Sequence, residues 1–245
     1  MVRTVDYDSR KRAVLASTIN RYIQHAEPVS SGDIAKEFDL SSATIRNIFA
    51  DLEQSGLLTH PYTSGGRIPT NKGYRYYVDF LISQMDLLDN EKERIVKEYG
   101  REIGRLEDAL EDTSEIISMI THYAGMVSSL ERQDKLFYRG LSHVLDQPEF
   151  KDYQKIRIVI KMIEDKGRLL SIINQDFDGK VKVYIGKELG CPEIEHCSLV
   201  VSNYRVNNKP SGKLAVFGPA RMEYNHIIPT LEYISDCLTD ALDDF

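Results

Sequence analysis

The stretch VSSGDIAKEFDLSSATIRNIFADLEQSGLLTHPYTSGGRIPTNKGYRYY, residues 29–77, decides the fold of the N-terminal part of the chain. It opens with a pattern that predicts a short helix. Ser30 is the expected N-cap, and Asp33 follows three residues later, as in a capping box with Asp in place of the usual Glu. Asp39 and Leu40 then predict a tight turn, so that a second helix must follow closely.

The second helix is expected to begin with Ser41 or Ser42 as its cap and to end at Gly56, a residue type that accepts a left-handed conformation. Two short extended pieces then flank the residues Ser-Gly-Gly at 64–66, and Thr70 is the expected cap of another helix. Helix, turn, helix and β-hairpin in this order predict a winged helix-turn-helix.

The second helix has an apolar stripe and an opposite face of small and polar residues. At about 100° per residue, the side chains expected to pack inward are Ile45, Ile48, Phe49 and Leu52. The opposite face and its flanks carry Ala43, Thr44, Arg46, Asn47, Ala50 and Gln54. Asn and Gln can pair with adenine, Arg with guanine, and Ala or a Thr methyl group can contact the thymine methyl. This face is therefore a candidate for reading bases in the major groove, although it also fits the exposed side of an ordinary core helix.

The glycine-rich hairpin offers a second contact surface. No acidic residue lies between Pro61 and Pro69. Paired glycines allow the backbone to approach a phosphate chain, and Arg67 at the edge is expected to enter a minor groove. The alternatives are a plain turn with a solvated Arg, or a phosphate-binding glycine loop, which the absence of a GxxxxGK[ST] pattern disfavours. The residues expected to hold DNA phosphate are Ser42, Ser64 and Lys72.

Several motifs of this stretch resemble a known family. The pieces SSATIRN, ADLE..GLL, P.TS.GR.PT and KGYRYYVD are similar to the N-terminal part of the HrcA family, the bacterial heat-shock repressors that silence chaperone operons. Four later pieces resemble the distal half of the same family: FYRGLSHVLDQPEF, VKVYIGKE, CSLVVSNYRVNNKPSGKLAVFGPARMEY and IIPTLEYIS. The resemblance implies a sequence-specific repressor of chaperone genes that binds double-stranded DNA at an inverted-repeat operator as a homodimer, with chaperonin as a modulator.

The resemblance covers both ends of the chain and not its middle. Members of the family are usually longer, and the deficit here falls between Met126 and Phe137. That region would hold part of a GAF-like domain and an inserted dimerisation domain. A different dimer contact is therefore expected in this chain.

Composition limits the class of protein. The chain has 245 residues, 42% of them apolar and 28% charged, as in ordinary globular proteins of one large or two modest domains. It lacks a run of about 18 apolar residues and an apolar core near its start, so we expect a cytoplasmic protein without a membrane span. Its three cysteines, Cys191, Cys197 and Cys237, suit a reducing compartment rather than a disulfide framework.

Charge is unequally divided along the chain. Residues 1–79 contain ten Lys/Arg and nine Asp/Glu, whereas residues 80–245 contain 21 and 29. The N-terminal part is thus only marginally positive, and each subunit should make few phosphate contacts. Tight binding would then require two DNA-binding units on one site, which favours a dimer on an inverted repeat.

Two helices are expected on either side of the central stretch. The first should start after Asp8 or Ser9 and end near His25, with the basic run 10–12 either solvated or touching phosphate. The second should run from Asn71 to about Met85. Its expected inward residues are Tyr74, Tyr77, Val78, Leu81 and Ile82.

A long helical pattern then extends from Glu91 to about Val127. Its apolar positions alternate in steps of four and three: Tyr99, Ile103, Leu106, Leu110, Thr113, Ile117, Ile120, Ala124 and Val127. This spacing predicts a coiled-coil-like seam. The seam could form a dimer contact or an intramolecular bundle, and its second half could instead lie on the protein's own sheet. Gly100, Gly104 and Gly125 would permit close approach of another helix.

The remaining chain predicts an α+β domain with a GAF-like sheet. The expected strands are Lys135–Arg139, Arg168–Ile173, Val181–Ile185, Ser198–Val206 and Lys213–Phe217. The expected helices are Tyr153–Glu164 and Glu223–Ala241, with the second interrupted or kinked at Pro229. The chain should therefore divide into a winged-helix domain (1–85), a linker or dimerisation helix (86–128) and a truncated GAF-like sensor or dimerisation domain (129–245).

Patterns for catalysis are weak. Cys191, His196 and Cys197 lie close in sequence, but a fourth metal ligand is not evident, and buried structural cysteine is the commoner case. We expect no metal, no cofactor and no enzymatic activity. Two alternatives to a chaperone-gene repressor remain: a transcription regulator whose GAF-like domain binds a metabolite, and an enzyme with a DNA-binding domain.

Overall fold

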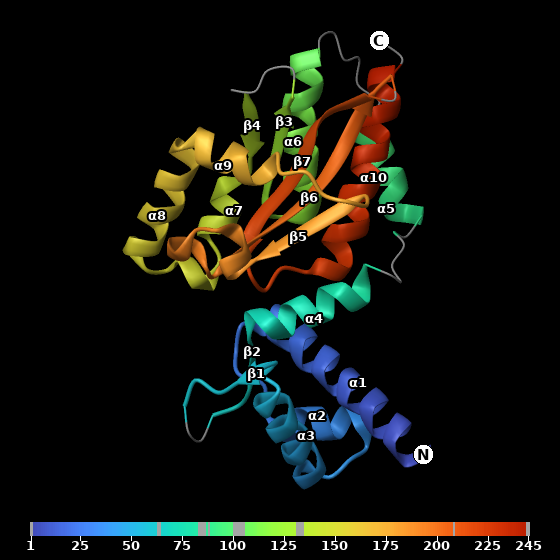
Figure 1. Ribbon diagram of the computed structural model, residues 1–245, viewed down its shortest axis with the longest axis vertical. Helices are drawn as coiled ribbons and strands as arrows, with labels where there is room; N and C mark the ends of the chain where they lie inside the picture. The colour runs from blue at the N-terminus through green and yellow to red at the C-terminus, as the bar shows by residue number, and fades with distance from the viewer. Residues whose placement is uncertain are drawn as a thin grey trace. The chain divides into compact units, whose positions relative to one another are not determined.

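The computed structural model describes residues 2–62, 65–82, 87, 89–99, 106–130, 135–207 and 209–243; side chains are not described at residues 2–6, 98 and 99. The chain forms two compact units, Met1–Ser83 and Gln84–Phe245. Figure 1 shows a helical first unit and a second unit built around a sheet. Helix and sheet are thus combined in one chain, and the α+β class expected from the sequence is confirmed.

The first unit is a winged helix-turn-helix, as predicted. Its elements are α1 (Val2–His25), α2 (Ser31–Phe38), α3 (Ser42–Gln54), β1 (Leu58–Thr59), β2 (Ile68–Pro69) and α4 (Asn71–Leu81). Strands β1 and β2 pair antiparallel, with Leu58 opposite Pro69. A single bridge between Val29 and Arg67 adds the segment before α2 to the same small sheet. The four apolar residues predicted to face inward from α3 are all buried.

The helix boundaries in the first unit follow from caps. The Ser30 hydroxyl accepts a hydrogen bond from the Asp33 amide at 3.2 Å, and its own proton goes to the Asp33 carboxylate, which lowers the pKa of that carboxyl. Of the two serines that could cap α3, Ser41 does so, accepting from the Thr44 amide at 3.1 Å. Gly56 follows α3 with φ of 71°, a left-handed conformation that glycine adopts without strain.

Three predicted features of the first unit are wrong. Helix α1 begins at Val2 rather than after Asp8 or Ser9, because the residues before these possible caps include no Gly or Pro to stop the helix. Helix α4 ends at Leu81, and Met85 lies outside the described residues. Ile82 is 46% exposed because it lies beyond the last turn of α4, where it no longer follows the inward stripe.

The described residues of the second unit form five strands and several helices. Its helices are α5 (Asp89–Tyr99), α6 (Leu106–Thr121), α7 (Leu141–Leu145), α8 (Tyr153–Glu164), α9 (Lys166–Ile173) and α10 (Tyr224–Asp243). Its strands are β3 (Ala124–Ser129), β4 (Leu136–Arg139), β5 (Val181–Ile185), β6 (Cys197–Val206) and β7 (Lys209–Pro219). Short 3-10 turns lie at Pro148–Phe150, Gly186–Leu189 and Pro192–Ile194. The strands form one antiparallel sheet in the order β4-β3-β7-β6-β5, with β3 and β7 side by side near its centre.

Helices cover both faces of this sheet (Figure 1). Helices α6 and α10 pack on one face, against β3 and β6. On the other face, side chains of α8 and α9 join a core with alternate residues of the strands, such as Met126, Leu199 and Phe217. Because both faces are covered, the central strands are buried along most of their length and show no simple alternation of polar and apolar residues.

The expected long helix to Val127 is wrong at its C-terminal end. His122 adopts φ of 55°, α6 has ended at Thr121, and the chain continues as strand β3. Apolar residues at 124 and 127 fit a helical spacing, but in a strand buried on both faces they carry no information on period. Of the possibilities for the seam, α6 lies on its own sheet: Leu110, Thr113 and Ile117 are buried there.

The glycines expected to allow helix packing behave differently from one another. Gly100 and Gly104 lie outside the described residues. Gly125 is in β3 rather than in a helix, and a Cβ added to it would lie 2.3 Å from the Ser114 carbonyl oxygen of α6. The close approach is therefore between a helix and the strand beneath it. The middle segment 86–128 of the expected division does not stand apart, because α6 and β3 belong to the core of the second unit.

The remaining predictions for the second unit are mostly confirmed. Four of the five expected strands are present, while Arg168–Ile173 is part of helix α9. A short apolar run such as LLSII fits either structure, and the side chain of Asp165 decides it by capping α9 through the Arg168 amide at 3.2 Å. Helix α10 passes Pro229 without interruption. In the described parts of the chain, no helix has the length and apolar character that crossing a membrane requires.

We predict that Gly73→Ala destabilises the first unit by about 1–3 kcal/mol, because the new methyl group would lie 2.2 Å from the Leu57 carbonyl oxygen. Gly32→Ala is the matched control, since Gly32 also lies in the first turn of a capped helix and its Cβ would meet only Ser30 Oγ at 3.7 Å. Amide hydrogen exchange of the first unit measures both changes. Equal protection in the two variants would contradict the proposed packing.

We predict that Ile117→Ala lowers the free energy of unfolding of the second unit by about 2–5 kcal/mol, because the side chain is fully buried between α6 and the sheet. Met119→Ala on the same helix, where the side chain is 40% exposed, should change it by less than about 0.5 kcal/mol. Hydrogen exchange of α6 gives the stability, and light scattering gives the mass. If the Ile117 variant stays folded and its particle mass in solution falls by half, the seam is a dimer contact after all.

Candidate nucleic-acid interface

Helix α3 presents its predicted polar face to solvent. Ala43, Arg46, Asn47, Ala50 and Gln54 are all exposed. Ser42 and Thr44 are partly exposed. The structure therefore brings the expected base-reading residues together on one face, and small side chains among them allow another molecule to approach the helix closely.

The N-terminal end of this face is suited to anions. Ser42 and Ala43 occupy the first turn of α3, where backbone N–H groups have no acceptor within the helix. Arg46 lies one turn further, is exposed, and donates from Nε to the Ser42 carbonyl oxygen at 3.2 Å. Backbone donors and a guanidinium are thus gathered at one end of the exposed face.

One flank of α3, formed by Thr44, Asp51 and Ser55, is attached to helix α1. The Tyr7 hydroxyl donates to the Asp51 carboxylate at 2.5 Å, and this hydrogen bond raises the pKa of the Tyr7 phenol. Lys11 Nζ lies 3.5 Å from the Ser55 hydroxyl. Tyr7 and Lys11 of α1 therefore contact this flank and help to fix α3 within the unit.

The other flank, formed by Arg46 and Glu53, faces the hairpin, which we call the wing. Arg67 Nη2 lies 2.9 Å from one Glu53 carboxylate oxygen, and His60 Nδ1 lies 2.6 Å from the other. Arg67 Nη1 also donates to the Gly65 carbonyl oxygen at 3.1 Å. The side chain of Arg67 thus lies against α3, and only 24% of it is exposed.

The other predicted contact residues occupy different surroundings. Lys72 is exposed and donates to the Ser55 carbonyl oxygen at 2.8 Å, at the C-terminal end of α3. Ser64 lies outside the described residues. Tyr62, on the wing, is 74% exposed. The sequence did not predict the roles of Asp51 and Glu53. For Glu53 a signal exists, because its seven-residue spacing from Arg46 places these two residues on the same flank of a helix.

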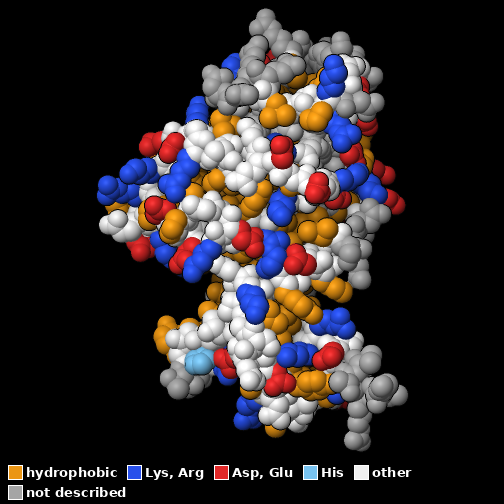
Figure 2. All heavy atoms as spheres, viewed as in Figure 1, with side chains coloured by type: hydrophobic (Ala, Val, Ile, Leu, Met, Phe, Trp, Pro, Cys, Tyr) orange, Lys and Arg blue, Asp and Glu red, His pale blue; other side chains and the backbone are white. Residues whose placement is uncertain are grey.

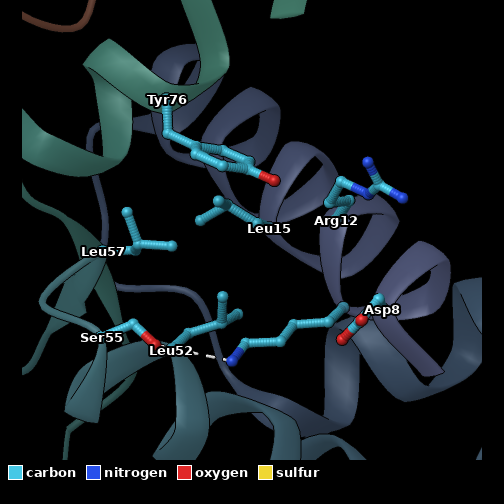
Figure 3. A pocket seen from close by; sticks show the side chains of 8 residues that line it. Asp8, Arg12, Leu15, Leu52, Ser55, Leu57 and Tyr76 are labelled. Carbon is cyan, nitrogen blue, oxygen red and sulfur yellow. Dashed lines mark hydrogen bonds between the residues drawn. The ribbon is translucent and has the colours of Figure 1, made fainter. Parts of the chain in front are cut away.

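A cavity of about 330 Å³ lies behind the flank of α3 that contacts α1 (Figure 3). Leu15, Leu52 and Leu57 form its apolar walls, the ring of Tyr76 lies across one side, and Asp8, Lys11, Arg12 and Ser55 complete the lining. It lies between α1, the end of α3 and α4. The cavity is therefore separate from the exposed face that carries Arg46 and Asn47.

The surface of the second unit has a different character. On the face shown in Figure 2, Lys/Arg and Asp/Glu side chains are interspersed, with apolar side chains between them. Residues 80–245 carry more Asp/Glu than Lys/Arg. Within the described ranges, no group of three or more His, Cys, Asp or Glu side chains could hold a metal ion. Cys197 is buried, and burial raises the pKa of its thiol, which favours the unreactive form.

Two family models match the chain. The model described as "Winged helix-turn-helix transcription repressor, HrcA DNA-binding" matches residues 7–80. The model described as "HrcA protein C terminal domain" matches residues 128–228. The two matches together include the winged helix, except the start of α1 and the last residue of α4, and most of the sheet of the second unit.

Curated relatives agree with these models. The heat-inducible transcription repressor HrcA of Carboxydothermus hydrogenoformans is 29% identical over 335 aligned positions, covering 96% of this chain and 98% of that protein. The repressor of the same name from Symbiobacterium thermophilum is 29% identical over 334 positions, with 95% and 98% covered. Because this chain has 245 residues, at least 90 of the 335 positions have no counterpart in it. The place expected for the deficit, between Met126 and Phe137, falls in the hairpin of β3 and β4.

One solved structure shares the fold. The crystal structure of a hypothetical protein at 2.2 Å resolution matches with a TM-score of 0.80 and 20% sequence identity, covering 96% of this chain and 98% of that one. At this identity the match supports the fold alone. The family models at both ends and the curated relatives along the whole length show that the chain belongs to the HrcA family of heat-inducible transcription repressors.

Proposed function

We propose that this protein represses transcription of heat-shock chaperone genes by binding an operator in double-stranded DNA through the exposed face of α3. The observation that carries this proposal is the arrangement of α3. Its apolar stripe is buried, Asp51 and Glu53 attach its two flanks to other elements, and Arg46 and Asn47 are exposed, where they can reach base edges. Such a helix matches the dimensions and the donor and acceptor pattern of the major groove.

Within this proposal the side chains have separate roles. The residues that read bases are Ala43, Thr44, Arg46 and Asn47, with Gln54 as a further contact near the other end of the helix. Ser42 and Ser64 hold phosphate. Lys72 can do the same while it donates to Ser55, because an ammonium group has three N–H donors. Phosphate contacts position the helix, and base contacts provide the sequence preference.

We also propose that two copies bind an inverted-repeat operator. The N-terminal 79 residues have a net charge of only +1, so one unit gains little from phosphate neutralisation. Two units on one site double the contacts and match the symmetry of an inverted repeat. The dimer contact does not use the inward residues of α6, since these are buried within the second unit.

We propose that heat lowers the fraction of molecules that can bind DNA. The relatives are named heat-inducible repressors, and we propose that this chain is inactivated by heat and restored by a chaperonin in the cytoplasm. Only a shift of a few kcal/mol between a binding-competent and an inactive form is needed for such control. The second unit, which holds most of the apolar core, is the proposed sensor.

A second candidate is regulation by a small ligand. A groove of about 220 Å³ lies between α8, α9 and the turn Pro192–Ile194, with Met162, Cys191 and Ile194 at its floor. Both signs of charge surround it, from Lys161, Asp165, Arg168 and Glu193. A thermal melt of the full chain against a metabolite library tests this candidate, because a ligand bound to the native state raises the melting temperature. A ligand that raises it and releases DNA would favour the second candidate over heat control.

Operator selection tests the proposed function directly. The purified full chain is mixed with a pool of random duplexes at low salt, and bound duplexes are amplified through several rounds. We expect an inverted repeat to emerge, and footprinting should find the same sequence upstream of chaperone genes. Failure to enrich any sequence, with the protein folded by circular dichroism, would exclude sequence-specific binding.

We predict that Arg46→Ala weakens binding to the selected duplex by about 1–3 kcal/mol and barely changes binding to random DNA, because a base contact adds specificity rather than general affinity. Arg157→Ala, an exposed arginine of α8 in the second unit, is the control for loss of one positive charge. Fluorescence anisotropy with both DNAs measures the effect. Equal losses on the two DNAs would mean that Arg46 touches only the backbone.

A further inference from the structure

We propose that Glu53 is a positioning residue that ties the wing to α3 through Arg67, so that Arg67 supports DNA binding from within the protein and does not enter a groove. This inference deepens the proposed DNA-binding function and rests on it. It also revises the role expected for Arg67 from the sequence. Side-chain atoms of Glu53, His60 and Arg67 are already engaged with one another within the protein.

Glu53 holds both arms of the wing with one carboxylate. His60 directly follows β1, and Arg67 directly precedes β2. One carboxylate oxygen of Glu53 contacts His60 Nδ1 at 2.6 Å, and the other contacts Arg67 Nη2 at 2.9 Å. Both oxygens of a single α3 side chain are therefore used by residues on opposite arms of the hairpin, which fixes the hairpin relative to the helix.

Arg67 is fixed by its backbone as well as by its side chain. Its amide donates to the Val29 carbonyl oxygen at 2.8 Å, and its carbonyl oxygen accepts from the Val29 amide at 2.9 Å. Gly66 permits this arrangement, because a Cβ at that position would lie 2.6 Å from the Val29 carbonyl oxygen. The backbone of Arg67 is thus held by two hydrogen bonds, and its guanidinium contacts Glu53.

Reaching a groove would require Arg67 to give up these contacts. Its Nη2 would leave Glu53, and its Nη1 would leave the Gly65 carbonyl oxygen. The Glu53 side chain, which is only 21% exposed, would keep its charge with one fewer partner. Removing one member of a partly buried charged pair is unfavourable, and the freed carboxylate would also repel the phosphates of bound DNA.

The consequence for DNA binding is geometric. Glu53 and Arg46 share one flank of α3, two turns apart, so the pair with Arg67 neutralises a negative charge next to the proposed base-reading face. The wing and α3 then approach DNA as one rigid body. The exposed part of the wing that is described includes Tyr62 rather than Arg67. The position of the wing on the duplex is therefore set by Glu53.

The test compares three variants of the full chain, Glu53→Ala, Arg67→Ala and the double variant, on the duplex selected with the unmodified protein. Each single variant should weaken binding about tenfold, as expected for loss of a charge-assisted contact that orders the wing. The double variant should be no weaker than either single variant, because the two residues act as one unit. The slope of log affinity against log salt should stay unchanged, since no Lys or Arg contact with phosphate is lost.

A direct DNA contact by Arg67 gives the opposite pattern. Arg67→Ala would then lower the salt slope by about 0.9, and Glu53→Ala would strengthen binding or leave it unchanged by freeing the arginine. Either result overturns the proposal. Arg139→Ala is the matched control, because Arg139 is also paired with a carboxylate, Glu111, and lies in the second unit.

Hydrogen exchange provides a readout that does not require DNA. The Arg67 amide is bonded to Val29, and its exchange should accelerate in Glu53→Ala if the carboxylate holds the wing. Unchanged exchange would overturn the proposal even if no operator were found, which separates its failure from failure of the proposed function. Glu53→Gln, which keeps the length of the side chain, should show a smaller acceleration and serves if the alanine variant does not fold.

Discussion

The structure of the first unit depends on burial of one stripe of α3. Ile45, Ile48, Phe49 and Leu52 are between 0% and 2% exposed, and each contributes about 1.5–3 kcal/mol by leaving water. This burial fixes the rotation of the helix about its axis. Every other side chain of α3 then has a defined direction, so the exposed face that carries Arg46 and Asn47 is a consequence of the same packing that folds the unit.

Carboxylates on the two flanks of α3 would oppose binding to a polyanion if they were free. Asp51 accepts from the Tyr7 hydroxyl, and Glu53 is shared between His60 and Arg67. These contacts direct both negative charges toward other parts of the protein and anchor the helix on two sides. The same residues thus serve two purposes: they hold α3 and the wing together, and they keep the outward face free of uncompensated negative charge.

The sequence predicted features set by local chemistry and failed where packing decides between two structures. Ser30, Gly56 and Thr70 specify caps through their own side chains or conformational freedom, and all three positions are confirmed. The segments 124–127 and 168–173 are short apolar runs that fit a helix or a strand. The helix predicted to reach Val127 and the strand predicted at Arg168–Ile173 are both wrong there. For the candidate site, the exposed face of α3 followed from helical period. The position of the Arg67 side chain did not, because it depends on a carboxylate fourteen residues away in sequence.

The small positive charge of the first unit makes the geometry of α3 and the wing important for function. With a net charge of +1 over residues 1–79 and an acidic remainder, non-specific attraction to DNA is weak. Affinity must then come from several directed contacts made at once, and these require α3 and the wing to keep a fixed relation. If folding already orders the wing, the entropy lost in ordering it does not weaken DNA binding. A wing that is mobile in the free protein would instead lose entropy each time the protein binds DNA. A carboxylate that holds both arms of the hairpin is therefore expected to matter more in this weakly charged protein than in a strongly basic DNA-binding domain.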